Sequence, residues 1–322
     1  MSLASDSDGY PNQPRCARFA CEAMATRFEL LIPGDRLRCA PAAQDALDEI
    51  ALWHRRLSYF DPASDISRIN ACAASGPVRV DSELFRLLEL CQQFHALTEG
   101  AFDPAIAAAM RAAGFRGSSR SEESVASARL ATGFHLVELD RADRTVRFLR
   151  PGVGLDLGAI GKGWALDRAM ERLREAGVAA AFLHGGTSSA VGYGEESDPP
   201  WAVRLGPDPG APTADLWNGA LGVSAPRGRM VDGSGHVLDP RTGSSAASAT
   251  LAAVLAGSAA EADALSTALL VDGPDARWIP DGVSAVSLVG GAWRVHPGSA
   301  TLIRPNSWAI HHDRTRRPHG EL

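Results

Sequence analysis

Strand-like and helix-like segments follow one another in an irregular order, and this order restricts the fold of the chain. The segments "HLVELD" and "TVRFLR" alternate in polarity and are separated only by "RAD", which predicts a β-hairpin. A second hairpin, formed by "VSAVSLV" and "AWRVH", is expected to turn at Gly290–Gly291. Long segments with apolar residues at helical spacing interrupt the strands without a regular βαβ repeat. The chain is therefore predicted to have an α+β fold.

Other segments complete this pattern. A strand is expected at 27–32, helices at 41–57 and 82–98, and a third helix from Trp164 to a C-terminal stop at Gly177. Strands at 179–184, 201–206, 219–224 and 249–256 and a helix at 258–271 are expected to follow. We expect residues 16–305 to form one domain between a disordered tail (1–15) and a polar tail (306–322).

Composition restricts the class of protein. The 322 residues carry a net charge of −6, which gives no electrostatic basis for a nucleic-acid partner. No apolar run approaches the ~20 residues that span a bilayer. The start, "MSLASDSDGYPNQPRC", lacks the pattern of a secretion signal, so a cytoplasmic location is predicted. The five cysteines contain no C-x-x-C pair and are expected to be reduced thiols rather than a disulfide or zinc framework.

The segment "DLGAIGKGWALD" contains Lys162, the only lysine of the chain. Lysine carries a compact charge where arginine carries a wide planar fork, so a narrow site beside a phosphate would keep lysine. The alternative is a lysine that survived drift toward arginine. The glycines of this strand-to-helix turn have two interpretations as well: they let N–H groups approach a phosphate at a helix N-terminus, or they relieve steric crowding.

The segment "SAAEADALSTALLV" begins with a capping-box pattern at Ser258 and Glu261, which predicts a helix start. Asp263 and Thr267 then lie four residues apart on one face, among apolar residues. A carboxylate and a hydroxyl in this position suit Mg²⁺, a hard cation. The alternative is an aspartate facing solvent and a threonine bonded back to the helix. Without a metal ion, a carboxylate on an apolar helix face would only cost desolvation energy, and the residues alone leave both interpretations open.

Two loop segments carry further candidates. In "GHVLDPRTG", His236 precedes turn residues and is a candidate general base; the alternative is a histidine with a structural role only. In "TEGAFDPAI", Phe102 and Asp103 are expected in a rigid corner of the chain. This corner either binds a planar heterocycle or is only a packed turn.

Taken together and in order, these segments resemble the FAD:protein FMN transferase (ApbE-like) family over residues 20–300. The matching stretches are "AMATRFEL", "LSYFDPASDISRIN", "TEGAFDP", "DLGAIGKGWALD", "HGG", "HVLDPRTG" and "ADALSTALLV". The resemblance implies two lobes built from mostly antiparallel sheets with flanking helices, and an active site in the cleft between the lobes. It also implies Mg²⁺-dependent transfer of FMN from FAD to a threonine or serine hydroxyl of an acceptor flavoprotein, with release of AMP.

The resemblance assigns roles to individual positions. The metal ion, Mg²⁺ or alternatively Mn²⁺, would be held by Asp263, Thr267 and the main-chain carbonyl of Ala159. His236 would take the proton of the acceptor hydroxyl, and Asp263 would act in catalysis through the metal. The residues that would contact FAD are Met24, Phe60, Ala101, Phe102, Asp103, Asp156, Lys162 and His236.

Several positions depart from the family pattern. Ala25 replaces a usual glycine, Phe60 a common tyrosine and Thr187 a frequent aspartate, and the segment at 225–235 is short. Two alternative functions therefore stand beside the transferase: an FAD pyrophosphatase that gives FMN and AMP, and a flavin-binding relative without catalysis.

Replacing Lys162 by arginine tests why this lysine is present. If its compact charge contacts FAD, Lys162→Arg is expected to weaken FAD binding and to slow turnover, because the guanidinium is too wide for the gap. Titration of FAD and the initial rate of AMP release measure these effects. Unchanged binding and turnover would remove this explanation.

Overall fold

The structure is a computed structural model that describes residues 16–116, 122–195, 199–206, 208, 210–226, 230–231 and 234–297, together with two-residue strands at 2–3 and 303–304. The expected tails, 1–15 and 306–322, lie outside the described residues apart from that first strand. The predicted α+β fold is confirmed.

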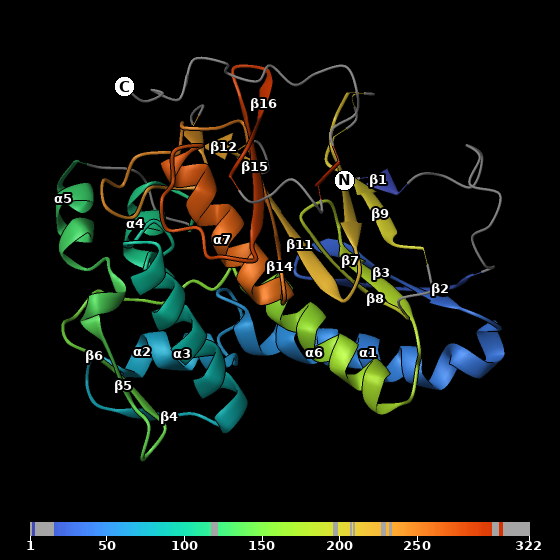
Figure 1. Ribbon diagram of the computed structural model, residues 1–322. Coiled ribbons are helices and arrows are strands. Elements are labelled where there is room, and N and C mark those ends of the chain that lie inside the picture. Colours follow the sequence, from blue (N-terminus) through green and yellow to red (C-terminus); the bar gives the residue numbers. More distant parts are fainter. Residues whose placement is uncertain are drawn as a thin grey trace, which may run out of the picture.

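An eight-stranded antiparallel sheet forms the centre of the molecule (Figure 1). Its strand order is β16-β15-β14-β11-β8-β7-β3-β2, and each neighbouring pair is antiparallel. The strands are β2 (Cys16–Ala23), β3 (Thr26–Pro33), β7 (Ala181–Gly185), β8 (Ser189–Tyr193), β11 (Gly219–Ser224), β14 (Leu251–Ala256), β15 (Ser284–Val289) and β16 (Ala292–Val295).

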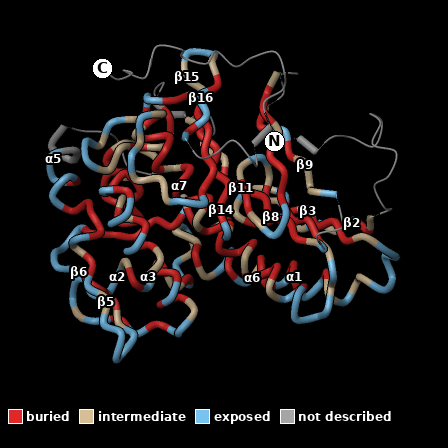
Figure 2. The backbone as a smooth tube through the Cα atoms, viewed as in Figure 1, coloured by how far each residue is buried: buried red, intermediate tan, exposed pale blue. Residues whose placement is uncertain are grey.

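The two faces of this sheet are covered differently. One face packs against α1 (Arg36–Leu57), α6 (Gly161–Glu175) and α7 (Ala259–Asp272). The other face packs against a small sheet of order β1-β9-β10-β17. These strands are β1 (Ser2–Leu3), β9 (Trp201–Arg204), β10 (Thr213–Leu216) and β17 (Ile303–Arg304). Buried residues consequently follow the central strands and the helix sides that face them (Figure 2).

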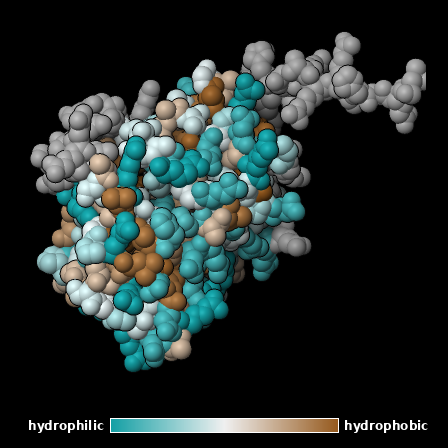
Figure 3. All heavy atoms as spheres, turned by 90° about the vertical axis from the view of Figure 1, so that its left-hand side faces the viewer, coloured by the Kyte–Doolittle hydropathy of each residue, from teal (hydrophilic) through white to brown (hydrophobic). Residues whose placement is uncertain are grey.

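A second part of the chain, between α1 and α6, is mainly helical. Its elements are α2 (Asp65–Cys72), β4 (Val78–Arg79), α3 (Ser82–Leu97), α4 (Ala107–Ala112), α5 (Glu122–Leu130), the 3-10 helix η1 (Phe134–Leu136), β5 (Val137–Asp140) and β6 (Thr145–Phe148). The strands form the sheet β4-β6-β5, which contains the predicted hairpin. One continuous hydrophobic core joins this part to α6 and α7. On the face that carries α5 and this hairpin, hydrophobic side chains gather in one area of the surface (Figure 3).

Most of the expected elements are present, and the differences have local causes. The first helix begins at Arg36 rather than at Pro41, because the Asp35 side chain accepts hydrogen bonds from the N–H groups of Leu37 and Arg38 and caps the helix there. The sequence pattern did not predict β8, which is buried along its whole length and therefore shows no alternation. The other elements it did not predict include β2, β10, α2, α4, α5 and the short hairpin of β12 (Met230–Val231) and β13 (Ser234–Gly235). All five cysteines lie in the described residues and none forms a disulfide, as predicted.

Two glycines allow α7 to lie close to its neighbours. A Cβ atom on Gly163 of α6 would stand 2.0 Å from the Ala259 carbonyl oxygen, and one on Gly222 of β11 would stand 2.2 Å from the Ala262 carbonyl oxygen. The N-terminal half of α7 thus packs directly against the backbone of α6 and of β11, because both contact positions are glycines.

Gly163→Ala is expected to lower the free energy of unfolding by about 1–3 kcal/mol, because the new methyl group meets backbone that cannot move aside. Helix propensity alone would give the opposite sign, a gain of about 1 kcal/mol. Urea denaturation measures the change. Gly76→Ala is the matched control, since a Cβ atom there has no neighbour within 4 Å. A Gly163→Ala variant as stable as the wild type would contradict the close contact.

Candidate functional site

Asp263 lies at the contact between α6 and α7 and is 5% exposed. Its Oδ1 accepts a hydrogen bond from the Ser189 hydroxyl (2.7 Å), and its Oδ2 accepts one from the Gly163 N–H (2.7 Å). Burial raises the pKa of this carboxyl to about 6, against the opposing effect of the nearby Lys162 charge. The alternative of an aspartate that faces solvent is wrong. The expectation of a carboxylate without protein partners is wrong as well.

Asp167 of α6 makes the complementary contact with α7. Its two oxygens accept the N–H groups of Ala259 (2.7 Å) and Ala260 (2.9 Å), the first two residues of α7. The N-cap residue of α6, Ile160, makes no side-chain cap hydrogen bond, so Asp263 supplies that cap from the neighbouring helix. Each helix thus carries an aspartate that caps the other. Burial raises the pKa of Asp167 to about 6.

Thr267 lies one turn after Asp263. Its hydroxyl donates to the Asp263 main-chain carbonyl (3.1 Å) and lies 3.2 Å from the Ser224 hydroxyl of β11. The back-bonded threonine of the alternative interpretation is therefore present. The hydroxyl oxygen keeps lone pairs for another partner.

The residues around Asp263 offer hard oxygen ligands. Among the described residues, no three His, Cys, Asp or Glu side chains gather closely enough to hold an ion by themselves. A cation here would depend on one carboxylate, from Asp263, together with neutral oxygens such as the Thr267 hydroxyl. Ala159, the expected carbonyl ligand, lies in the turn that leads into α6, whose N-terminal end contacts Asp263. This set fits Mg²⁺, which prefers oxygen and keeps several water ligands.

The glycine-rich turn before α6 is not a cradle of glycine N–H groups for a phosphate. The N–H groups of all three glycines donate within the protein, to Asp156 Oδ1 (from Gly158, 3.0 Å), the Leu157 carbonyl (from Gly161, 2.7 Å) and Asp263 Oδ2 (from Gly163, 2.7 Å). The phosphate interpretation is therefore wrong for these N–H groups, and the steric interpretation is correct for Gly163. The positive charge at this turn comes from the side chain of Lys162.

Asp156 and Phe60 are brought together by Arg116, a residue that the sequence analysis did not identify. Arg116 Nε donates to Asp156 Oδ2 (2.8 Å), and its guanidinium carbon lies 5.3 Å from the centre of the Phe60 ring and 5.3 Å from that of Tyr59. Arg116 follows α4 in a segment without a motif, so no sequence signal pointed to it.

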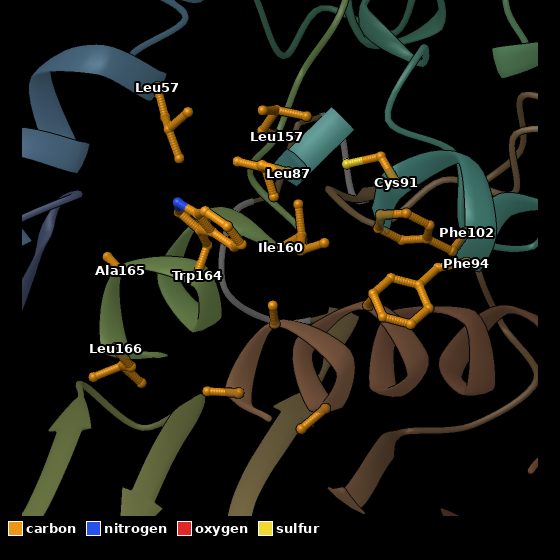
Figure 4. Packing of buried hydrophobic residues seen from close by; sticks show 14 of the residues in the cluster. Leu57, Leu87, Cys91, Phe94, Phe102, Leu157, Ile160, Trp164, Ala165 and Leu166 are labelled. Atoms are coloured by element: carbon orange, nitrogen blue, oxygen red, sulfur yellow. The ribbon is translucent and has the colours of Figure 1, made fainter. Parts of the chain in front are cut away.

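The segment around Phe102 is a packed turn. Phe102 is 1% exposed, and its ring packs edge-on against Phe94 in the core, near Cys91 (Figure 4). Asp103 accepts the N–H groups of Ala105 (2.8 Å) and Phe134 (3.1 Å). Ala101 is also 1% exposed. The Phe102 ring is therefore not available to stack on a heterocycle, because the core surrounds it.

Asp103 also contacts His95 of α3, with 3.3 Å between Asp103 Oδ2 and His95 Nδ1. Burial alone would lower the pKa of His95, but the hydrogen bond and charge of Asp103 raise it. Asp103 thus stabilises the corner that leads toward Asp156, whose N–H donates to the Pro104 carbonyl (2.8 Å).

Met24 lies in the tight turn between β2 and β3. Met24 and Ala25 both have positive φ, 49° and 58°. The Met24 N–H donates to His54 Nδ1 of α1 (3.0 Å), which fixes the turn against the helix. Glycine adopts positive φ without the steric penalty of a Cβ atom. Ala25, which replaces the glycine usual in the family, therefore adopts this φ at an energetic cost.

His236 is half-buried directly after β13. The bridge between Leu238 and Ser245 closes the turn that follows. A cavity of about 410 Å³ lies between this turn and α4 and α5. Thr187, which departs from the family pattern, lies in the turn between β7 and β8, and part of the short segment 225–235 lies outside the described residues.

The structure thus assembles two groups of candidates. Asp263, Thr267, Lys162 and Ala159 gather at the α6–α7 contact; Asp156 and Phe60 gather around Arg116, beside the 101–105 corner. Asp156 and Ala159 belong to the same loop before α6 and connect the groups along the chain; the strand expected directly before this loop is not present in the described chain, since β6 ends at Phe148. The protein is thus an α+β protein with two candidate binding features. The carboxylate and hydroxyl on α7 are a candidate site for a cation, and the aromatic and carboxylate side chains around Arg116 are a candidate site for a planar ligand.

Comparisons with known proteins agree with this description. The model of the ApbE family matches residues 24–285. The ApbE protein of Thermotoga maritima has a similar structure, with a TM-score of 0.79 and 27% identity, covering 88% of this chain and 97% of that one. The ApbE flavinyl transferase of Pseudomonas stutzeri, at 22% identity and a TM-score of 0.78 over 91% and 99% of the two chains, shares the fold. This chain belongs to the ApbE family.

Two relatives by sequence carry the name FAD:protein FMN transferase. The protein of Rhodobacter capsulatus is 34% identical over 227 residues, and that of Chlamydia trachomatis serovar D is 31% identical over 221 residues. The alignments cover 66% and 65% of this chain, and 43% and 69% of the two relatives, so the chain spans less than half the length of the Rhodobacter protein.

None of the helices in the described part of the chain combines the length and the apolar character needed to cross a lipid bilayer.

Asp167→Asn is expected to change how stability depends on pH. Because burial raises the pKa of Asp167 from its ordinary value of 3.8 to about 6, the folded protein holds this proton where the unfolded chain has lost it. The free energy of unfolding of the metal-free protein should therefore decrease as the pH rises from about 4 to about 6. In Asp167→Asn this decrease should be smaller by about 1–3 kcal/mol. The raised pKa of Asp263 makes stability decrease with pH in the same direction, and it does so in both the wild type and Asp167→Asn.

Urea denaturation in EDTA between pH 4 and pH 7 measures the difference. Asp45→Asn, a change of an exposed residue, is the matched control and should leave the profile unaltered. Identical profiles for the wild type and Asp167→Asn would show that burial does not raise the pKa of Asp167.

Proposed function

We propose that this protein is a Mg²⁺-dependent transferase that moves the FMN part of FAD onto a threonine or serine hydroxyl of an acceptor flavoprotein and releases AMP. The observation that carries this proposal is the buried Asp263, held by Ser189 and Gly163 beside Thr267 and Lys162. Membership of the ApbE family and relatives named FAD:protein FMN transferase support it.

Each residue has a part in the proposed reaction. Asp263, Thr267 and the Ala159 carbonyl would hold Mg²⁺, which when bound neutralises the pyrophosphate and improves AMP as the leaving group. Lys162 would place its charge beside the phosphate oxygens. Asp263 is preorganised for this role, because its two hydrogen bonds fix the carboxylate before any ligand arrives.

The acceptor hydroxyl is a weak nucleophile and needs a base. His236 would take its proton as the hydroxyl oxygen forms a bond to the FMN phosphorus, while the bond from that phosphorus to the AMP oxygen breaks. The remaining candidates would contact FAD: Met24 at its turn, Phe60 and Asp156 at the Arg116 cluster, and the main chain of residues 101–103. The proposed site would lie between the sheet part and the helical part, in the cleft that the family resemblance implies.

The experiment incubates the purified protein with FAD and Mg²⁺, with and without a threonine-bearing acceptor domain. AMP is measured by chromatography, and flavin by fluorescence of the denatured acceptor. The expected result is AMP in step with acceptor-bound flavin, abolished in Asp263→Asn and slowed about 100-fold or more in His236→Gln, the effect of losing a general base. Cys72→Ser, at an exposed position, is the control.

The two alternatives give different results. AMP with free FMN at the same rate whether or not the acceptor is present would identify an FAD pyrophosphatase. FAD that binds but is never cleaved at any Mg²⁺ concentration would identify a flavin-binding relative. Activity that survives in Asp263→Asn would refute the proposed metal site.

A further inference from the structure

Arg116 forms a partly buried ion pair with Asp156. The two side chains are 11% and 7% exposed. Both Nε (2.8 Å) and Nη2 of Arg116 donate to Asp156 Oδ2, while Asp156 Oδ1 accepts the Gly158 N–H (3.0 Å). The carboxylate is therefore neutralised and held from both sides.

The same guanidinium also lies against two aromatic rings. Its central carbon is 5.3 Å from the ring centres of both Tyr59 and Phe60, within the range of a cation–π contact. Tyr59 is itself fixed, because its hydroxyl accepts a hydrogen bond from Arg111 (3.1 Å), and it meets Phe60 edge-on at 81°. Phe60 nevertheless remains 64% exposed. One planar cation thus orients an aromatic ring that still presents surface to solvent.

Phe60 is the ring suited to stack on a ligand. Phe102 is enclosed by the core, whereas Phe60 stands in the loop that follows α1. A phenylalanine lacks a hydroxyl with which to fix its own position, so its orientation depends on the neighbouring side chains. An uncompensated Asp156 carboxylate at this place would also repel a pyrophosphate.

We propose that Arg116 is a positioning residue of the flavin site. It fixes the positions of the Phe60 ring and the Asp156 carboxylate. It also neutralises the charge of Asp156, so that this carboxylate does not repel the pyrophosphate of a dinucleotide whose planar ring stacks on Phe60. The inference rests on the proposed function, because it takes FAD to be the ligand.

The test compares the wild type with Arg116→Gln and Arg116→Lys, each checked for folding by far-UV circular dichroism. Titration gives the Kd for FAD, steady-state kinetics give KM and kcat, and visible circular dichroism of the bound flavin reports the orientation of its ring. Arg150→Ala, a change of an exposed arginine that donates to the Leu130 carbonyl, is the control.

We expect Arg116→Gln to raise Kd and KM for FAD about tenfold, because losing the charge-assisted hydrogen bonds of Nε and Nη2 to Asp156 leaves the carboxylate and the Phe60 ring without a fixed position. The change in kcat should stay within about twofold, because Arg116 is not assigned to the reacting atoms. The visible circular dichroism should change. Arg116→Lys should fall between the wild type and Arg116→Gln, since it keeps the charge and loses the planar fork.

Other results overturn the inference. An Arg116→Gln variant that binds FAD as the wild type does, with the same visible spectrum, removes the positioning role while the proposed function stands. A variant that binds more tightly shows that the ion pair competes with the ligand. A wild type that binds no FAD in the presence of Mg²⁺ overturns the proposed function and this inference together.

Discussion

The mutual capping of α6 and α7 is the interaction on which the rest of the structure depends. Asp263 of α7 accepts an N–H from the first turn of α6, and Asp167 of α6 accepts two N–H groups from the first turn of α7. Both carboxylates lie at the positive ends of helix dipoles, which compensates part of their burial. Gly163 permits the contact, because any side chain there would strike the Ala259 carbonyl. The candidate metal ligand is thus also a structural element that joins two helices on one face of the sheet.

The sequence predicted the fold class and many of the elements, because period and turn chemistry are local. The strand at 219–224 and the hairpin at Gly290–Gly291 are correct, and the capping role of Ser258 is present as a hydrogen bond to the Glu261 N–H. Buried strands such as β8 were not predicted, since a strand covered on both faces has no polar alternation. The start of α1 was placed too late, because Asp35 is a stronger start signal than Pro41.

The candidate site was predictable only in part, and the limit is again physical. Motifs pointed to Asp263, Thr267 and Lys162, which the structure brings to one place. The partners Ser189, 74 residues away, and Arg116, 40 residues from Asp156, depend on tertiary packing and leave no pattern in the sequence. The glycine turn shows the opposite case, since its local pattern suggested N–H groups for a phosphate that tertiary contacts have already taken. With those N–H groups used, the side chain of Lys162 supplies the positive charge of this turn, and this charge acts on Asp263.

The structural role of Asp263 affects how related sequences are to be interpreted. A descendant that had lost its activity would still need this carboxylate to hold α6, so selection for folding alone would preserve it. The aspartate alone, without Thr267 and Lys162 beside it, therefore does not distinguish an active relative from an inactive one. Lys162 is half-buried and makes none of the cap hydrogen bonds; its charge acts on the Asp263 carboxylate from beside the cap. A change at Lys162 would therefore leave the hydrogen bonds of Asp263 to Gly163 and Ser189 in place, whereas a change at the aspartate would remove them.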